Sequence, residues 1–213
     1  MILLSEIVDE IKKDISGGIS NDDSRFDDLY LEGKIHAARA VIIANYLQKG
    51  LEWINDSWVQ TLDLNYVDRY KTCDVVSFEC PSVITIDMHN DGFIYVGHAN
   101  GVKPFIRARR SFTTLTMHSV FKNSKQIMWD WKNLELNKQS LLIYNNSKLE
   151  FLQVRAIFNV PTLVPGFRKD TDWYPVDSNL RRDIVEMVSM DMLRKNRNAP
   201  DYISDSQDKP TTK

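Results

Sequence analysis

The chain has 213 residues, of which 43% are hydrophobic and 26% are charged, and its formal net charge is −2 at pH 7. These values are typical of a folded protein with one large core or two small ones, and they exclude global disorder. A charge so close to zero also excludes a general attraction to nucleic acid or anionic membranes, so only local patches could bind them.

We expect neither export nor membrane insertion. Acidic residues follow the apolar start of the chain at once, without a basic leader, and no apolar run is long enough to cross a membrane. Cys73 and Cys80 are the only cysteines, and with four scattered histidines they cannot build a structural zinc site. This sparse use of cysteine favours a reduced, intracellular setting.

Two helices are predicted before residue 50. The first carries one apolar stripe and ends at Gly17-Gly18; the stripe consists of Leu3, Leu4, Ile7, Val8, Ile11 and Ile15. The second is expected to begin with Asp22, Asp23 or Ser24 as its N-cap and to run to Gly50. Apolar residues surround much of its axis between 37 and 47. More than one neighbour must therefore cover this helix, either a second domain or another copy of the chain.

From residue 51 onward the apolar period changes to two, which predicts strands. Residues 83–108 predict consecutive strands that reverse at the Asn-Asp-Gly of 90–92 and at the Asn-Gly of 100–101, because both favour tight turns. Residues 140–161 predict a hairpin that turns at Asn145-Asn146. The segment 126–136 is compatible with a short helix or with an irregular pair of strands.

A final helix is predicted after residue 174. Pro175 and either Asp177 or Ser178 provide its start, and it should end near Asn198, with apolar residues at helical spacing, namely Leu180, Ile184, Met187, Val188 and Met192. Residues 199–213 contain too few apolar groups to fold alone. They are either a frayed terminus or an arm that orders on a partner, anchored by Tyr202 and Ile203.

This order of elements predicts an α+β fold, in which the N-terminal helices and the C-terminal helix pack together with an antiparallel β insertion between them. The positions at which the apolar spacing changes between the helical period and a period of two set the boundaries of these regions. We assign residues 1–50 and 175–198 to a helical body, residues 51–174 to the β-rich insertion and residues 199–213 to a flexible arm.

The sequence contains none of the motifs of phosphate loops, dinucleotide sites or nucleophile elbows. Its histidines never occur at metal-binding spacing. His89 and His98 could meet across a hairpin beside Asp87 or Asp91, but polar edge positions explain them better. We therefore predict no catalytic residue, no cofactor and no metal. A metal-dependent hydrolase or nuclease, with a site assembled from scattered residues, stays open as an alternative.

Two groups of arginines are candidates for an interface. Arg107 and Arg109 would project from one face of a strand, with Arg110 adjacent. They could bind an acidic protein surface or nucleic acid, or they could pair with acids on a neighbouring strand. Arg181 and Arg182 lie near the start of the final helix, where positive charge is unfavourable, which suggests that a partner supplies the counter-charge.

The five tryptophans are many for this length. Core packing explains most of them. Trp129 and Trp131 would share one face of an extended strand, where an aromatic pair can equally anchor an interface. A small β module that binds carbohydrate or protein is therefore a further alternative.

The chain as a whole resembles a known family. A short amphipathic helix, a long helix leading into "KIHAARAVIIANYLQKGLEWINDSWVQTLDL", a β insertion and the terminal "YPVDSNLRRDIVEMVSMDMLRKNRNAPDYISDSQD" are similar to the head-to-tail connector proteins of tailed bacteriophages. More narrowly, they resemble the ring or adaptor proteins of short-tailed crAss-like phages. The resemblance covers nearly the whole chain and rests on architecture, since this class has no catalytic signature.

The resemblance implies a structural protein of the virion, assembled in the host cytoplasm as a homo-oligomeric ring of about twelve copies between portal and tail. DNA would pass through the ring only as cargo. In such adaptors the helices form the body of the ring, and the C-terminal segment reaches the portal or a neighbouring subunit. The large β insertion departs from the smaller, mostly helical adaptors.

Overall fold

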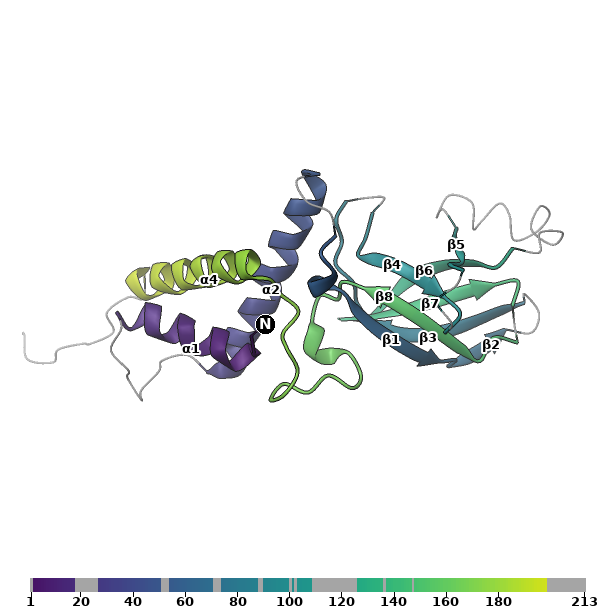
Figure 1. Ribbon diagram of the computed structural model, residues 1–213, viewed down its shortest axis with the longest axis horizontal. Helices are drawn as coiled ribbons and strands as arrows, with labels where there is room; N and C mark the ends of the chain where they lie inside the picture. Colours follow the sequence, from purple (N-terminus) through teal and green to yellow (C-terminus); the bar gives the residue numbers. More distant parts are fainter. Residues whose placement is uncertain are drawn as a thin grey trace, which may run out of the picture.

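A computed structural model describes residues 2–17, 27–50, 54–70, 74–87, 90–99, 101, 103–108, 126–135, 137–146 and 148–198 (Figure 1). Within them, three α-helices lie at one end of the molecule and the strands lie at the other; the helices are α1 (Leu4–Ile15), α2 (Asp28–Gln48) and α4 (Ser178–Asn198). The predicted α+β class is confirmed. No helix in the described part of the chain is long and apolar enough to span a membrane.

Local side-chain chemistry fixes the helix ends. The carboxylate of Glu6 accepts the main-chain N–H of Leu3 at the start of α1, and Asp177 accepts that of Leu180 at the start of α4. Helix α2 begins at Asp28 and is capped by Asp27, so the N-cap predicted within residues 22–24 is wrong. Several acids in this run can accept an N–H, and the sequence pattern does not distinguish between them.

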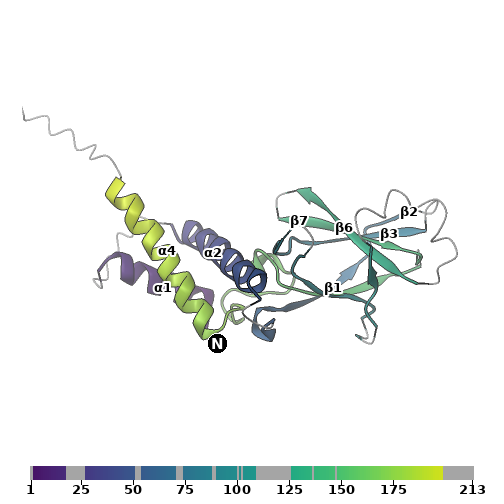
Figure 2. The same ribbon diagram turned by 90° about the horizontal axis from the view of Figure 1, so that it is seen from above.

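The three helices share one apolar cluster, in which α4 contacts both α1 and α2. Figure 2 shows α4 crossing α1, with α2 between α4 and the strands. The fully buried side chains of the cluster come from all three helices and from the segments beside them, and include Leu4, Ile7, Ile11, Leu31, Ile35, Ile43, Trp58, Tyr174, Leu180 and Ile184. Packing between helices therefore holds the N-terminal and C-terminal parts of the chain together.

The strands form two sheets that pack face to face over a second apolar cluster. One sheet has the order β1 (Gln60–Asn65), β8 (Phe151–Ala156), β4 (Phe93–Gly97). The other has the order β2 (Asp68–Tyr70), β3 (Val75–Pro81), β7 (Lys138–Tyr144), β6 (Met128–Glu135), β5 (Ile106–Arg107). Alternate residues of both sheets point inward, among them Phe78, Leu141, Ile143, Leu152 and Val154.

The strand pairing decides one open alternative and corrects one prediction. The segment 126–136 contains β6, a single strand whose register against β7 shifts between Asn133 and Glu135. It forms a hairpin with β7 through Asn137, which has a φ of 65°. The hairpin predicted at Asn145-Asn146 is wrong, because β7 and β8 belong to different sheets. Asn145 also has a positive φ of 65°, but here the turn carries the chain across to the opposite sheet. Among the described strands, pairing is antiparallel except between β5 and β6, which run parallel.

The helices meet the sheets around Arg39, a fully buried residue in the middle of α2. Its guanidinium donates three hydrogen bonds of 2.9 Å to main-chain carbonyls, from Nε to Pro175, from Nη1 to Phe158 and from Nη2 to Trp58. These carbonyls lie before α4, after β8 and at the end of the 3-10 helix η1 (Asp56–Trp58). A single side chain thus ties α2 to the segments that lead into and out of the β region.

His36 lies one helical turn before Arg39 and is also buried. Its Nδ1 is 2.7 Å from the hydroxyl of Tyr174, and its Nε2 is 3.3 Å from the hydroxyl of Thr162, in the 3-10 helix η3 (Pro161–Leu163). Burial, together with the positive charges of Arg39 and Lys169, lowers the pKa of His36 from 6.5 to about 4. The imidazole is therefore neutral at physiological pH.

Replacing Arg39 by lysine should destabilise the protein by about 3 kcal/mol, because one ammonium group cannot reach three carbonyls and leaves buried acceptors without a donor. Urea denaturation measures the free energy of unfolding. The matched control is Arg155→Lys, at an exposed arginine 3.5 Å from Asp56, where we expect a change within about 0.5 kcal/mol. Equal stabilities of the two variants would show that Arg39 is not a structural anchor.

The buried neutral His36 predicts a loss of stability in acid. The unfolded chain takes up a proton near pH 6.5 that the folded chain takes up only near pH 4, so the free energy of unfolding falls as the pH falls through this window. We expect a loss of about 2 kcal/mol from this residue between about pH 7.5 and about pH 5. The His36→Gln variant should lose less over the same interval, and parallel pH profiles of the two proteins would contradict the assignment.

Candidate functional site

The outer face of α2 is apolar and exposed. Leu29, Gly33, Ala37 and Val41 follow one another at intervals of four residues, and we call them the α2 row. Leu29 is 68% exposed and Val41 is 47% exposed. The prediction that α2 is apolar on more than one side agrees with this arrangement, because the helical cluster and the β region cover only its inner side.

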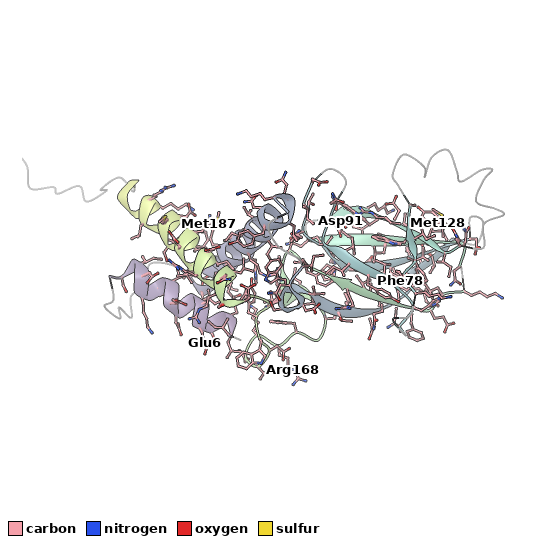
Figure 3. All side chains as sticks on the ribbon, turned by 45° about the horizontal axis from the view of Figure 1, so that its top comes forward. Glu6, Phe78, Asp91, Met128, Arg168 and Met187 are labelled. Carbon is pink, nitrogen blue, oxygen red and sulfur yellow. The ribbon has the colours of Figure 1, made fainter. Side chains whose placement is uncertain are left out.

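A second exposed apolar strip lies on α4. Met187, Met190 and Leu193 are spaced by three residues and are 45%, 49% and 40% exposed; we call them the α4 row. Figure 3 shows Met187 on this helix. Met187 was expected on the inward face, but α4 turns it outward and buries Val188 and Met192 instead. Arg182 and Arg194 are exposed beside the row.

A groove of about 630 Å³ runs between α1 and α4. Arg181 crosses it and donates to Glu10 of α1, with its Nη2 2.6 Å from the carboxylate. The counter-charge expected from a partner is therefore supplied to Arg181 within the chain. Arg182 also lines the groove and makes no hydrogen bond or ion pair with the residues that the structure describes.

The arginine of β5 is likewise engaged within the chain. Arg107 donates to the carboxylate of Asp91, whose side chain is 3% exposed, and its guanidinium lies 5.4 Å from the centre of the Trp129 ring. Asp91 also accepts a hydrogen bond of 2.7 Å from the indole of Trp131. Figure 3 places Asp91 in the β region. This is the pairing with a neighbouring acid that the sequence left open.

Four of the predicted interface residues lie outside the described part of the chain. They are Arg109, Arg110, Tyr202 and Ile203. The interface roles of these residues, and of Arg107, Arg181 and Arg182, stay predictions.

The paired tryptophans of β6 belong to the second apolar cluster. Trp129 is 5% exposed and packs edge to face on Phe93, with the ring centres 5.0 Å apart, and Trp131 is half-buried beside it. The pair therefore does not form an exposed aromatic patch. The reading of the chain as a β module with tryptophan anchors loses the observation on which it rested.

Possible metal-binding groups are dispersed within the described part of the chain. Among the described residues, no three histidines, cysteines, aspartates or glutamates lie close enough to hold a metal ion. His98 packs edge to face on Phe105, whereas Cys73, His89 and His118 lie outside the described residues. Burial raises the pKa of the Cys80 thiol to about 12, which keeps it protonated and unreactive.

The sequence matches a family of known proteins. The model of the family described as phage tail ring protein 2, of crAss-like phages, matches residues 6–209, which include the β region and most of the helical cluster. No curated protein is similar enough in sequence to match. A match over nearly the whole chain shows the family, and it agrees with the architecture described above. The chain therefore belongs to the phage tail ring protein 2 family.

Proposed function

We propose that this protein is a non-catalytic subunit of a closed homo-oligomeric ring at the junction of portal and tail, through which DNA passes. The observation that carries the proposal is the family match over residues 6–209. The two exposed apolar rows on α2 and α4 support it, because subunits that close into a ring need two different patches that fit each other. The dispersed catalytic groups favour a structural role over hydrolysis.

We further propose that residues 199–213 act as an arm that docks on the portal or on a neighbouring ring. These residues follow α4 directly, and their composition is that of a segment that orders only on a partner. Tyr202 and Ile203 are its largest apolar side chains and the expected anchors. Arg109 and Arg110, with the part of the Arg107 side chain that its ion pair with Asp91 leaves exposed, are proposed as a second contact, toward an acidic surface.

Counting the subunits in purified virions tests the ring. We expect about twelve copies per particle, or a small multiple, because a single ring at a unique vertex has a fixed and small copy number. Quantitative mass spectrometry against the major capsid protein gives the ratio. Hundreds of copies per particle would contradict a ring at one vertex, and absence from virions would contradict a structural role altogether.

Deleting residues 199–213 should abolish docking and leave the fold intact. Every described buried residue of the helical cluster precedes residue 199, so we expect the free energy of unfolding to change by less than about 0.5 kcal/mol. Pull-down of the portal protein and of neighbouring tail proteins measures docking. The finer variant Tyr202→Ala with Ile203→Ala should behave like the deletion, whereas Thr211→Ala with Thr212→Ala should dock normally. Normal docking by the deleted chain would contradict the arm.

A further inference from the structure

The two exposed rows have complementary shapes. The α2 row is high at Leu29 and Val41 and low between them, at Gly33 and Ala37, and no other atom lies in the space where Gly33 would carry a Cβ. It is thus a shallow, saddle-like depression along the helix. The α4 row consists of three long, unbranched or γ-branched side chains that form a ridge along the edge of the groove between α1 and α4, which Met190 and Leu193 also line. Methionine adapts readily to the surface on which it packs.

The spacing of the two rows allows them to interlock. Residues four apart define one set of ridges and grooves on a helix, and residues three apart define another. A ridge of the second kind fits a groove of the first kind when the axes cross at roughly 20° and lie about 8–10 Å apart. At 1.5 Å per residue the α4 row is about 9 Å long and the α2 row about 18 Å long, so the ridge fits between Leu29 and Val41.

Charges near the rows set the relative direction of the helices. Asp27, the N-cap of α2, and Asp28, which pairs with Lys12 of α1, precede Leu29, and Arg194 follows Leu193 near the end of α4. An antiparallel arrangement brings Arg194 to the acidic end of α2 and opposes the two helix dipoles favourably. A parallel arrangement would instead place Arg194 toward the C-terminal half of α2, away from these carboxylates, and would align the two helix dipoles unfavourably.

The two rows cannot meet within one chain. Helix α2 already contacts its own α4 along another side, where Lys34 pairs with Asp191 and the hydroxyl of Tyr46 donates to Asp183. Both rows therefore stay exposed on the same molecule, on different faces. Two different patches that fit each other form a heterologous contact, which propagates from copy to copy until a ring closes.

We propose that Met187, Met190 and Leu193 of one copy pack antiparallel on Leu29, Gly33, Ala37 and Val41 of the next copy, and that this contact joins adjacent subunits. The inference rests on the proposed ring function and adds the surfaces that build the ring. It assigns the occupant of each face to a second copy of this chain, because each row supplies the shape and the charge that the other lacks.

Two single substitutions test the contact. Ala37→Glu and Met190→Glu each place a charge in the centre of one row, at an exposed helical position where the fold should tolerate it, and each should weaken self-association at least about tenfold. Thermal unfolding confirms that the variants are folded, and sedimentation velocity measures their assembly. Ser5→Glu, at an exposed position of α1 outside both rows, is the matched control and should assemble like the unmodified chain.

Mixing the two variants gives the decisive result. Each variant keeps one intact row, so the α4 row of Ala37→Glu can pack on the α2 row of Met190→Glu. The resulting heterodimer has no second pair of intact rows and cannot grow further. We expect heterodimers and nothing larger. Assembly of either variant into the same oligomer as the unmodified chain would overturn the inference and leave the ring function standing.

The contact and the ring function are tested by different measurements. An unmodified chain that stays monomeric at the highest attainable concentration would overturn the contact, because the two rows are present on every copy. The ring function itself is tested by the count of copies in the virion. A mixture that stays monomeric while the unmodified chain assembles would also overturn the proposed pairing, since the intact rows would have failed to meet.

Discussion

A single buried guanidinium connects the helical end of this protein to its β region. Arg39 has no carboxylate partner among the described residues, and three carbonyl dipoles balance its charge instead. Burial lowers its pKa to about 10, still well above physiological pH, so the side chain stays charged. A planar group with five fixed donors suits this task better than any other side chain, since it can satisfy several acceptors in different directions at once.

The position of these carbonyls gives Arg39 its importance. Trp58 lies where the chain passes from α2 to the first strand, Phe158 lies just after the last strand, and Pro175 lies just before α4. Near the same point Asp177 caps α4 and accepts hydrogen bonds from the indole of Trp58 and the amide of Asn55. Hydrogen bonds among polar groups at this junction thus tie the β region to the helical end.

Some charged side chains of this protein are paired within the chain, whereas some apolar side chains are exposed to solvent. Two arginines that look like surface charges, Arg107 and Arg181, form ion pairs with Asp91 and Glu10 of the same chain. In contrast, the apolar rows of α2 and α4 lie on the outside. Solvent-exposed apolar strips of this kind mark interfaces in proteins that assemble. In the proposed ring they would place the contact surfaces on the helices, while the sheets bury Phe78 and Trp129 in a core of their own.

The sequence by itself determined the elements and their class. Apolar spacing gave α1 and α4, and the change to a period of two gave the strands, because periodicity records which face of an element is buried. It also revealed that α2 is apolar on more than one side. Local chemistry of this kind depends only on neighbours in the chain, so it can be recognised without the fold.

Only the tertiary structure decided which elements become neighbours. Asn137 and Asn145 both adopt a positive φ, but one closes the hairpin of β6 and β7 and the other leads from one sheet to the other. Likewise Met187 and Met192 both fit the helical pattern of α4, yet the positions of α1 and α2 bury Met192 and leave Met187 exposed. The three carbonyls that receive Arg39 lie 19, 119 and 136 residues away from it in the chain. Such contacts depend on packing between distant segments, which local sequence patterns do not encode.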